Sequence, residues 1–248
     1  MPDRLSREPD SDVPPAEQPV GASEFVLDNP VLHSLAGTHR LLAVSSGRVA
    51  GYPVDVSPFM AIPVDATAED WAQLSKLAGD DLITLIDAPT PPLGWVMHRE
   101  LTVVQMTGMA ASGTANDHGF TIVPLDDRDA PEMLELAQRT NPGPFAERTN
   151  RLGSFFGVRA DGALIAMAGE RLRPPGWTEI SAVCTDERYR GLGLARALME
   201  RVIDGIRTRG DQPFLHVAAT NTGAIRLYEH MGFQPRRTSR VTVIAPEA

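Results

Sequence analysis

The segment that decides the fold is Arg188-Tyr189-Arg190-Gly191-Leu192-Gly193-Leu194-Ala195. It follows an apolar run at residues 180–184 and opens an amphipathic pattern of helical period, so it joins a buried strand to a helix start. The first N–H groups of a helix have no intrahelical partner and lie at the positive end of its dipole. Glycines let a ligand approach those donors, so this turn predicts an anion site suited to a pyrophosphate.

Three interpretations of this turn compete. A Walker A loop requires Gly-Lys-Ser/Thr at the helix start, and the chain has Gly193-Leu194-Ala195 there, so we reject it. A Rossmann fingerprint requires a small residue where Arg196 stands and an acid where the next strand ends in Thr220-Asn221, which disfavours it. A tight turn without any ligand stays open on this segment alone.

A second short helix follows downstream, over residues 221–233. Asn221 or Thr222 suits its N-cap, and Gly232 suits the left-handed conformation that ends it. The apolar positions between them recur at helical spacing: Ala224, Leu227, Tyr228 and Met231.

The two segments together resemble the GNAT superfamily of acyl-CoA-dependent N-acetyltransferases. The motifs are Arg-Gly-x-Gly-x-Ala at 190–195 and Asn-x-x-Ala-x-x-Leu-Tyr-x-x-x-Gly-Phe at 221–233, in this order and separated by a helix and a strand. The resemblance covers about residues 120–244. It implies an α/β fold with a mixed central sheet, helices on both faces, and acetyl-CoA as cosubstrate.

Composition narrows the class of protein further. The formal net charge of -9 argues against a general nucleic-acid surface. The same charge would repel CoA, which is an anion, so a local positive charge from Arg188, Arg190 and Arg196 would have to attract it. The single cysteine, Cys184, cannot form an internal disulfide, which favours a cytoplasmic protein. We expect no membrane span, no secretory signal and no metal, since the histidines show no ligand spacing.

The chain divides into three expected regions. Residues 1–22 form an acidic, proline-rich tail that we expect to be disordered. Residues 23–115 form a smaller α/β domain; its similar element types leave open a degenerate copy of the same fold, although no internal sequence repeat is visible. Residues 118–248 form the acetyltransferase domain, and the small polar residues at 107–117 mark the boundary.

Local signals define the predicted elements. Asn29 should cap a helix that has Pro30 at its first position and is stopped by Gly37, and Asp129 should cap another helix with Glu132 in capping-box register. Asp161-Gly162 predicts a hairpin. The remaining predicted elements are strands at 39–54, 82–86, 95–106, 120–124, 155–159, 163–170, 178–185, 214–219 and 238–244, and helices at 66–78 and from 194 to Gly210.

The resemblance implies the cosubstrate contacts. The pyrophosphate would lie on the backbone amides of the turn, and Arg190 is the basic residue that opens the motif. Backbone groups near Val183 and Thr185 would pair with pantetheine and polarise the thioester, and Asn221 would contact CoA. Core packing of Val183 and a plain helix cap at Asn221 are the alternatives. The turn amides belong to Gly191, Leu192, Gly193, Leu194 and Ala195.

The resemblance also implies catalytic roles. Tyr228 is the predicted general acid, which protonates the departing CoA thiolate. Glu179, at the start of a strand, is the predicted general base, acting directly or through water, with Glu170 and His216 as rivals. Strand alternation would put Glu179 on the same side as Val183. An acceptor amine of low pKa would need no base.

The predicted reaction transfers an acetyl group to a primary amine of a small molecule, amino acid or peptide. A non-catalytic acyl-CoA-binding module and an acyltransferase for longer acyl chains are the alternatives. The acceptor itself is left open, as is a homodimer. We expect the loops at 141–145 and 171–175 at the mouth of the acceptor pocket, where Arg171 or Arg173 would attract a carboxylate if they are not simply solvated.

Overall fold

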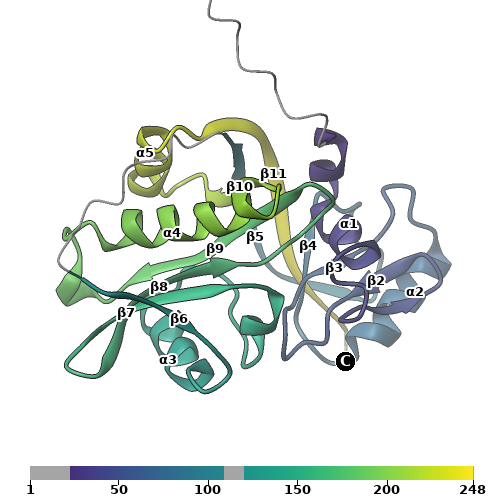
Figure 1. Cartoon of the computed structure of the whole chain (residues 1–248). Coiled ribbons are helices and arrows are strands. Elements are labelled where there is room, and N and C mark those ends of the chain that lie inside the picture. The colour runs from purple at the N-terminus through teal and green to yellow at the C-terminus, as the bar shows by residue number, and fades with distance from the viewer. Residues whose placement is uncertain (1–22, 109–119, 248) are drawn as a thin grey trace, which may run out of the picture.

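The structure, a computed structural model, describes residues 23–108 and 120–247. The tail at 1–22 and most of the expected boundary at 107–117 lie outside these residues. A large sheet forms the centre of the molecule, and a smaller sheet with two helices lies beside it (Figure 1).

The large sheet has eight strands in the order β4-β11-β5-β10-β9-β8-β7-β6. β9 and β10 are parallel, and every other neighbouring pair is antiparallel. The mixed α/β fold expected from the sequence is confirmed. The strands are β4 (Ile83–Ile86), β5 (Trp95–Thr107), β6 (Ile122–Leu125), β7 (Phe155–Ala160), β8 (Ala163–Glu170), β9 (Trp177–Thr185), β10 (Gln212–Ala218) and β11 (Gln234–Pro246).

Helices cover both faces of this sheet. The helix α3 (Ala130–Thr140) packs on Phe155, whereas α4 (Leu194–Thr208) packs on the adjacent Phe156, because successive strand residues face opposite sides. The short helix α5 (Thr222–His230) precedes β11. Two 3-10 turns complete this part: η2 (Thr149–Leu152) and η3 (Glu187–Tyr189).

The smaller sheet lies in the first part of the chain. Its antiparallel strands run in the order β1-β2-β3. The elements here are η1 (Glu24–Asp28), α1 (Pro30–Ala36), β1 (Val44–Ser46), β2 (Val49–Gly51), β3 (Met60–Ala61) and α2 (Ala68–Ala78). In residues 23–108 and 120–247, no helix is both long and apolar enough to cross a bilayer.

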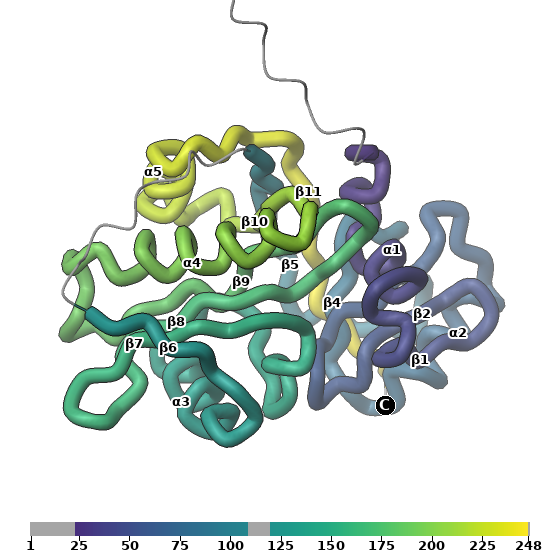
Figure 2. The backbone as a smooth tube through the Cα atoms, in the orientation of Figure 1, coloured from purple at the N-terminus to yellow at the C-terminus, as the bar shows by residue number. Residues whose placement is uncertain are grey.

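The large sheet takes strands from both sides of the expected boundary at 107–117. β5 lies between β10 and β11, and β4 pairs with the outer side of β11 (Figure 2). The first part of the chain therefore contributes two strands to the same sheet as the acetyltransferase motifs. The division into two domains stays a prediction.

Two local predictions had different outcomes. The Asn29 side chain accepts the Leu32 N–H at 3.1 Å, which confirms the cap of α1. The capping box at Asp129 and Glu132 was wrong, because neither side chain caps α3: both carboxylates bind the Arg159 guanidinium at 2.5 Å, and Asp129 also accepts the N–H of Asp126, which precedes the helix. The guanidinium adds a full opposite charge and several donors, so it competes with the helix N–H groups for these carboxylates.

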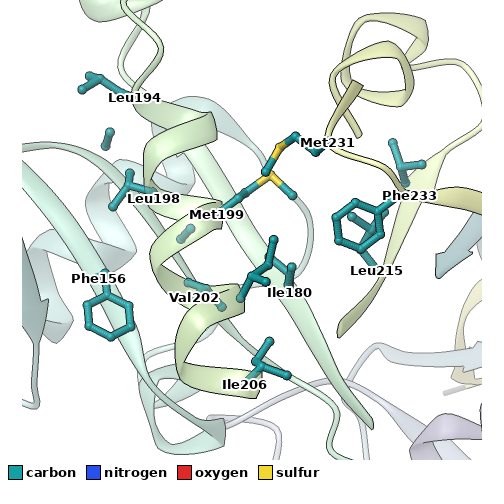
Figure 3. Packing of buried hydrophobic residues seen from close by; sticks show 14 of the residues in the cluster. Phe156, Ile180, Leu194, Leu198, Met199, Val202, Ile206, Leu215, Met231 and Phe233 are labelled. Carbon is teal, nitrogen blue, oxygen red and sulfur yellow. The ribbon is translucent and has the colours of Figure 1, made fainter. Parts of the chain in front are cut away.

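The buried face of α4 forms the main core. Figure 3 shows Leu198, Met199 and Val202 directed toward the sheet, with Met231 from the end of α5 beside Met199. Met231 leads into Gly232, whose φ of 89° is the left-handed conformation predicted for the helix end. The packing fixes the start of α4 relative to α5 and to β9.

A buried histidine joins the first part of the chain to the second. His39 is 4% exposed, and its Nε2 donates to the carbonyl of Leu152 at 2.9 Å. A carbonyl only accepts, so Nδ1 carries the lone pair and accepts from the Tyr52 hydroxyl at 2.9 Å. Burial lowers the pKa of His39 to about 4, so the ring is neutral in the folded protein at neutral pH.

This pKa predicts acid-sensitive stability. In the unfolded chain, the histidine titrates near its ordinary pKa of 6.5. The contribution of neutral His39 to the free energy of unfolding is therefore fully present above that pH and is lost as the pH falls toward 4. We expect a loss of about 2–3 kcal/mol between pH 7 and pH 4.5 from this residue, measured by urea unfolding. His39→Gln should be less stable at pH 7 but should lose correspondingly less on acidification. An equal loss in both proteins would contradict this assignment.

Candidate active site

The glycine turn presents unpaired backbone donors. Gly191 and Gly193 have φ of 81° and 79°, values that L side chains rarely adopt, which explains the two glycines. The first hydrogen bond of α4 runs from Ala197 N–H to the Gly193 carbonyl. Between residues 191 and 196, no N–H has a backbone acceptor outside α4 in the described chain. These donors fit an anion such as a pyrophosphate.

Only one of the three arginines near the turn is free for a ligand. Arg188 pairs with Asp186 at 3.1 Å, and Arg196 pairs with Glu200 at 2.8 Å. Arg190 has no acidic partner among the described residues, and it lines both a cavity of about 600 Å³ and a hollow of about 230 Å³ over the turn. The local positive charge expected from three arginines therefore comes mainly from Arg190.

The parallel strands β9 and β10 separate beside the turn. Their register pairs join 177–179 to 212–214, and no pair follows Glu179 and Phe214, although both strands continue. The edge of β9 that faces β10 is therefore unpaired from residue 180 to Thr185. Such an edge can hydrogen-bond an amide-rich ligand as a further strand would.

A β-bulge redirects the end of β9. Ala182 has φ of 53°, and the register with β8 shifts at this point. Ile180 and Val183 pack with the buried residues of α4 (the α4 cluster), whereas Ala182 between them packs with the buried residues of α3. The expected alternation of Glu179 with Val183 was wrong, because the extra residue of a bulge inverts the faces that follow it.

The larger cavity occupies the gap between the separated strands. It reaches from Arg190 and Ala195 at the turn to Arg99 on β5, and its walls combine aliphatic side chains with a few polar groups. The loop at 141–145 contributes Asn141 to Pro144 to the lining, whereas the loop at 171–175 contributes only Arg171 among the described residues. The other lining residues are Phe59, Thr84, Ile86, Leu101, Val103, Thr140, Arg171, Val183, Cys184, Thr185, His216, Val217, Ala218, Asn221, Ala224, Leu227, Tyr228, Val241 and Val243.

Two polar residues line the cavity near the turn: Tyr228 on α5 and Asn221 at the N-cap of that helix. The hydroxyl of Tyr228 has no hydrogen bond to another described residue, and burial raises the pKa of Tyr228 to about 12. Asn221 is the N-cap, as one interpretation predicted, since its Oδ1 accepts the Ala224 N–H at 3.1 Å. Its amide nitrogen is left for a ligand.

Glu179 lies in a buried ion pair. The Arg171 guanidinium donates to both carboxylate oxygens, at 2.7 and 2.9 Å, and His216 Nδ1 lies 2.7 Å from Oε1. Burial alone would raise the pKa of Glu179, but Arg171 and His216 lower it to about 2. Glu179 is 0% exposed and is not among the residues that line the cavity.

The tautomer of His216 follows from its neighbours. Arg236 can only donate, and it binds Gln105 Oε1 at 2.8 Å, so the Gln105 nitrogen is the donor to the Leu27 carbonyl and to His216 Nε2. His216 Nε2 is therefore the acceptor, and the proton of the neutral ring lies on Nδ1, which donates to Glu179. Both ring nitrogens of His216 are already used within the protein.

The other sequence-predicted residues have structural partners. Glu170 is buried and binds Arg209 at 2.7 Å, away from the cavity lining. Arg173 lies 3.9 Å from Asp211 and does not line the cavity either. Cys184 is buried, and burial raises the pKa of its thiol to about 11. Among the described residues, no three His, Cys, Asp or Glu gather as a metal site would require.

Arg99 is a cavity residue that the sequence interpretation missed. The signal was the alternation Arg99, Leu101, Val103, which places one arginine at the end of an apolar strand face. Nothing in the sequence showed that this strand lies beside β10.

Comparisons with known proteins show the family of this chain. A model of the FR47-like protein family matches residues 155–242. The N-alpha-acetyltransferase RimI of Mycobacterium tuberculosis is 33% identical over 132 residues, which span 49% of this chain and 82% of that protein. The ribosomal protein bS18-alanine N-acetyltransferase of Escherichia coli is 33% identical over 119 residues, 46% of this chain and 80% of that protein.

A solved structure extends the similarity to nearly the whole chain. It is described as a GNAT-family acetyltransferase from Novosphingobium aromaticivorans, with 43% identity and a TM-score of 0.80. The match covers 90% of this chain and 99% of that one. The chain therefore belongs to the GNAT superfamily and is an acyl-CoA-dependent N-acetyltransferase, as the sequence resemblance implied.

The buried pair of Arg171 and Glu179 predicts a specific pattern of stability. Glu179→Gln should lower the free energy of unfolding by about 3–5 kcal/mol, because it leaves a buried guanidinium without its counter-charge. Adding Arg171→Met should recover part of that loss. Urea unfolding of the two single variants and the double variant measures this coupling. Additive losses in the double variant would show that the two groups do not interact as described.

Proposed function

We propose that the chain transfers the acetyl group of acetyl-CoA to a primary amine by direct attack of the amine on the thioester. One observation carries this proposal: a single cavity is lined by Arg190 and Ala195 at the two ends of the glycine turn, by Val183 and Thr185 on the unpaired edge of β9, and by Tyr228. A cosubstrate with a phosphate end, an amide-rich arm and a reactive thioester requires these features in this order.

The cosubstrate contacts follow from the free groups. The pyrophosphate lies on the N–H groups of Gly191 to Ala195, assisted by Arg190, which has no acidic partner among the described residues. The amides of pantetheine pair with β9 near Val183 and Thr185. A main-chain N–H there binds the thioester oxygen as negative charge develops, and such a donor is typically worth about 3 kcal/mol. The Asn221 amide nitrogen is a further donor.

Tyr228 acts as the general acid. Because its pKa is raised to about 12, the hydroxyl keeps its proton through neutral pH. Complete transfer to a thiolate with an ordinary pKa of about 8.5 is uphill by roughly 5 kcal/mol. The hydroxyl therefore acts first as a hydrogen-bond donor to the sulfur, and proton transfer is completed as CoA leaves.

Tyr228→Phe tests this role. It should lower kcat by about 100- to 1,000-fold, within the usual contribution of a general acid, and should leave the Kd of acetyl-CoA within about twofold. Release of free CoA thiol measures the rate, and calorimetry measures the affinity. Tyr52→Phe, which removes a buried hydroxyl outside the cavity, is the matched control. An unchanged kcat, or a loss confined to affinity, would contradict the role.

We propose that no side chain of the described cavity takes the proton of the amine directly. The Glu179 carboxylate is buried and paired with Arg171, and His216 has both nitrogens engaged, so Glu179 is a positioning residue that holds Arg171 and His216. The acceptor then attacks as the neutral amine and loses its proton to water. This selects amines of low pKa, such as the α-amino group of a peptide, which has a pKa near 8.

Two relatives support an α-amino acceptor by the activity in their names. One is an N-alpha-acetyltransferase, and the other acetylates an alanine of ribosomal protein bS18.

The acceptor pKa should control the pH profile. At pH 7.5, a short peptide with a free α-amine should have a kcat/KM about 100-fold above that of an Nα-blocked peptide with one lysine, because far less of the lysine is neutral. The profile of each should rise with pH until the pKa of its own amine. Profiles that level off at one common pH for both peptides would reveal a base on the enzyme and would contradict this mechanism.

A further inference from the structure

The charge of the large cavity differs from that of the whole chain. The chain has a net charge of -9, yet the described residues that line the cavity include three arginines and no aspartate or glutamate. The three are Arg99, Arg171 and Arg190. Such a lining attracts anions and repels a dication or a basic peptide.

Two of these arginines already have a role. Glu179 neutralises Arg171 with two hydrogen bonds. Arg190 lies at the glycine turn, where the cosubstrate phosphates are proposed to bind. Arg99 has no such role, since no ion pair or hydrogen bond joins its side chain to another described residue.

Arg99 faces away from the glycine turn. Val104 and Met106 of β5 pack with the α4 cluster, so the alternate residues Leu101 and Arg99 point to the opposite face of the sheet. The turn lies at the start of α4, on the first face. Arg99 is therefore on the side from which an acceptor, and not the phosphates of CoA, enters the gap between β9 and β10.

The register of three strands places Arg99 at the end of an apolar surface. Val243 of β11 lies between Thr84 of β4 and Arg99, and the next row has Ile86, Val241 and Leu101. All six residues line the cavity. An acceptor bound along this surface would contact aliphatic side chains over most of its length. The end of the acceptor farthest from the thioester would contact one unpaired guanidinium, that of Arg99.

We propose that the acceptor amine carries a carboxylate that binds the Arg99 guanidinium, with its apolar part on Leu101, Val241 and Val243. This inference rests on the proposed acetyl transfer and names the class of acceptor. A guanidinium binds a carboxylate through two parallel hydrogen bonds, which gives orientation as well as affinity. The carboxylate belongs either to a free amino acid or to an acidic side chain near the N-terminus of a peptide.

Matched acceptors test this proposal and distinguish the two sources. Leucine is compared with leucinamide, and Ala-Asp-Ala amide is compared with Ala-Asn-Ala amide. In at least one pair, the charged acceptor should have the higher kcat/KM, by about 10- to 100-fold, the usual range for a charge-assisted hydrogen bond. The pair that shows the preference identifies the source.

Variants assign the preference to Arg99. Arg99→Gln should remove it, mainly through KM, while the rate with the neutral acceptor and the Kd of acetyl-CoA stay unchanged. Arg99→Lys should keep part of it. Arg40→Gln, a change at an exposed arginine outside the cavity lining, is the control. Equal slowing of the charged and neutral acceptors by Arg99→Gln, or loss of acetyl-CoA affinity, would overturn the proposal.

A binding measurement separates this inference from the proposed function. Calorimetry with the CoA-saturated protein measures the affinity of the same acceptors without turnover. Carboxylate-dependent binding that Arg99→Gln abolishes, without any acetyl transfer, would refute the proposed reaction and support the carboxylate site. Transfer without any preference for the charged acceptor would support the reaction and refute the site.

Discussion

The separation of β9 from β10 is the constraint on which the site depends. Two parallel strands that pair only at 177–179 and 212–214 leave main-chain donors and acceptors exposed in the middle of a sheet. A sheet normally satisfies those groups, so the gap is costly unless a ligand fills it. The bulge at Ala182 turns the end of β9, and α4 and α5 then bring the glycine turn and Tyr228 to the same gap.

A buried network of charged and polar side chains lies where β9 separates from β10. Glu179 is in the last register pair with Phe214, and its carboxylate binds His216, two residues further along β10. Arg171 donates hydrogen bonds to the same carboxylate. Gln105 donates to Nε2 of His216 and is itself oriented by a hydrogen bond from Arg236. Every member is satisfied, which is the condition under which a buried polar network gives one defined geometry. In this account Glu179 shapes the cavity wall instead of taking a proton.

Much of the fold was predictable because its signals are local. The caps of α1 and α5, the Asp161-Gly162 hairpin and the turn at Gly191 each depend on a few adjacent residues. The parts that failed depend on distant partners. Arg159 takes the carboxylates of Asp129 and Glu132, the bulge at Ala182 inverts the faces of β9, and Arg99 enters the cavity only because β5 lies beside β10. No periodicity in one segment contains that information.

The central claim is that unpaired main-chain groups at 180–185 and 191–196 form the site of acetyl-CoA. Amide hydrogen exchange, measured residue by residue with and without the cosubstrate, tests it most directly, since unpaired amides exchange fast and bound ones are protected. We expect fast exchange for the amides at 191–196 and on the free edge of β9 in the protein alone, and protection of both when acetyl-CoA saturates it. Saturation with acetyl-CoA that protects neither segment would contradict the account.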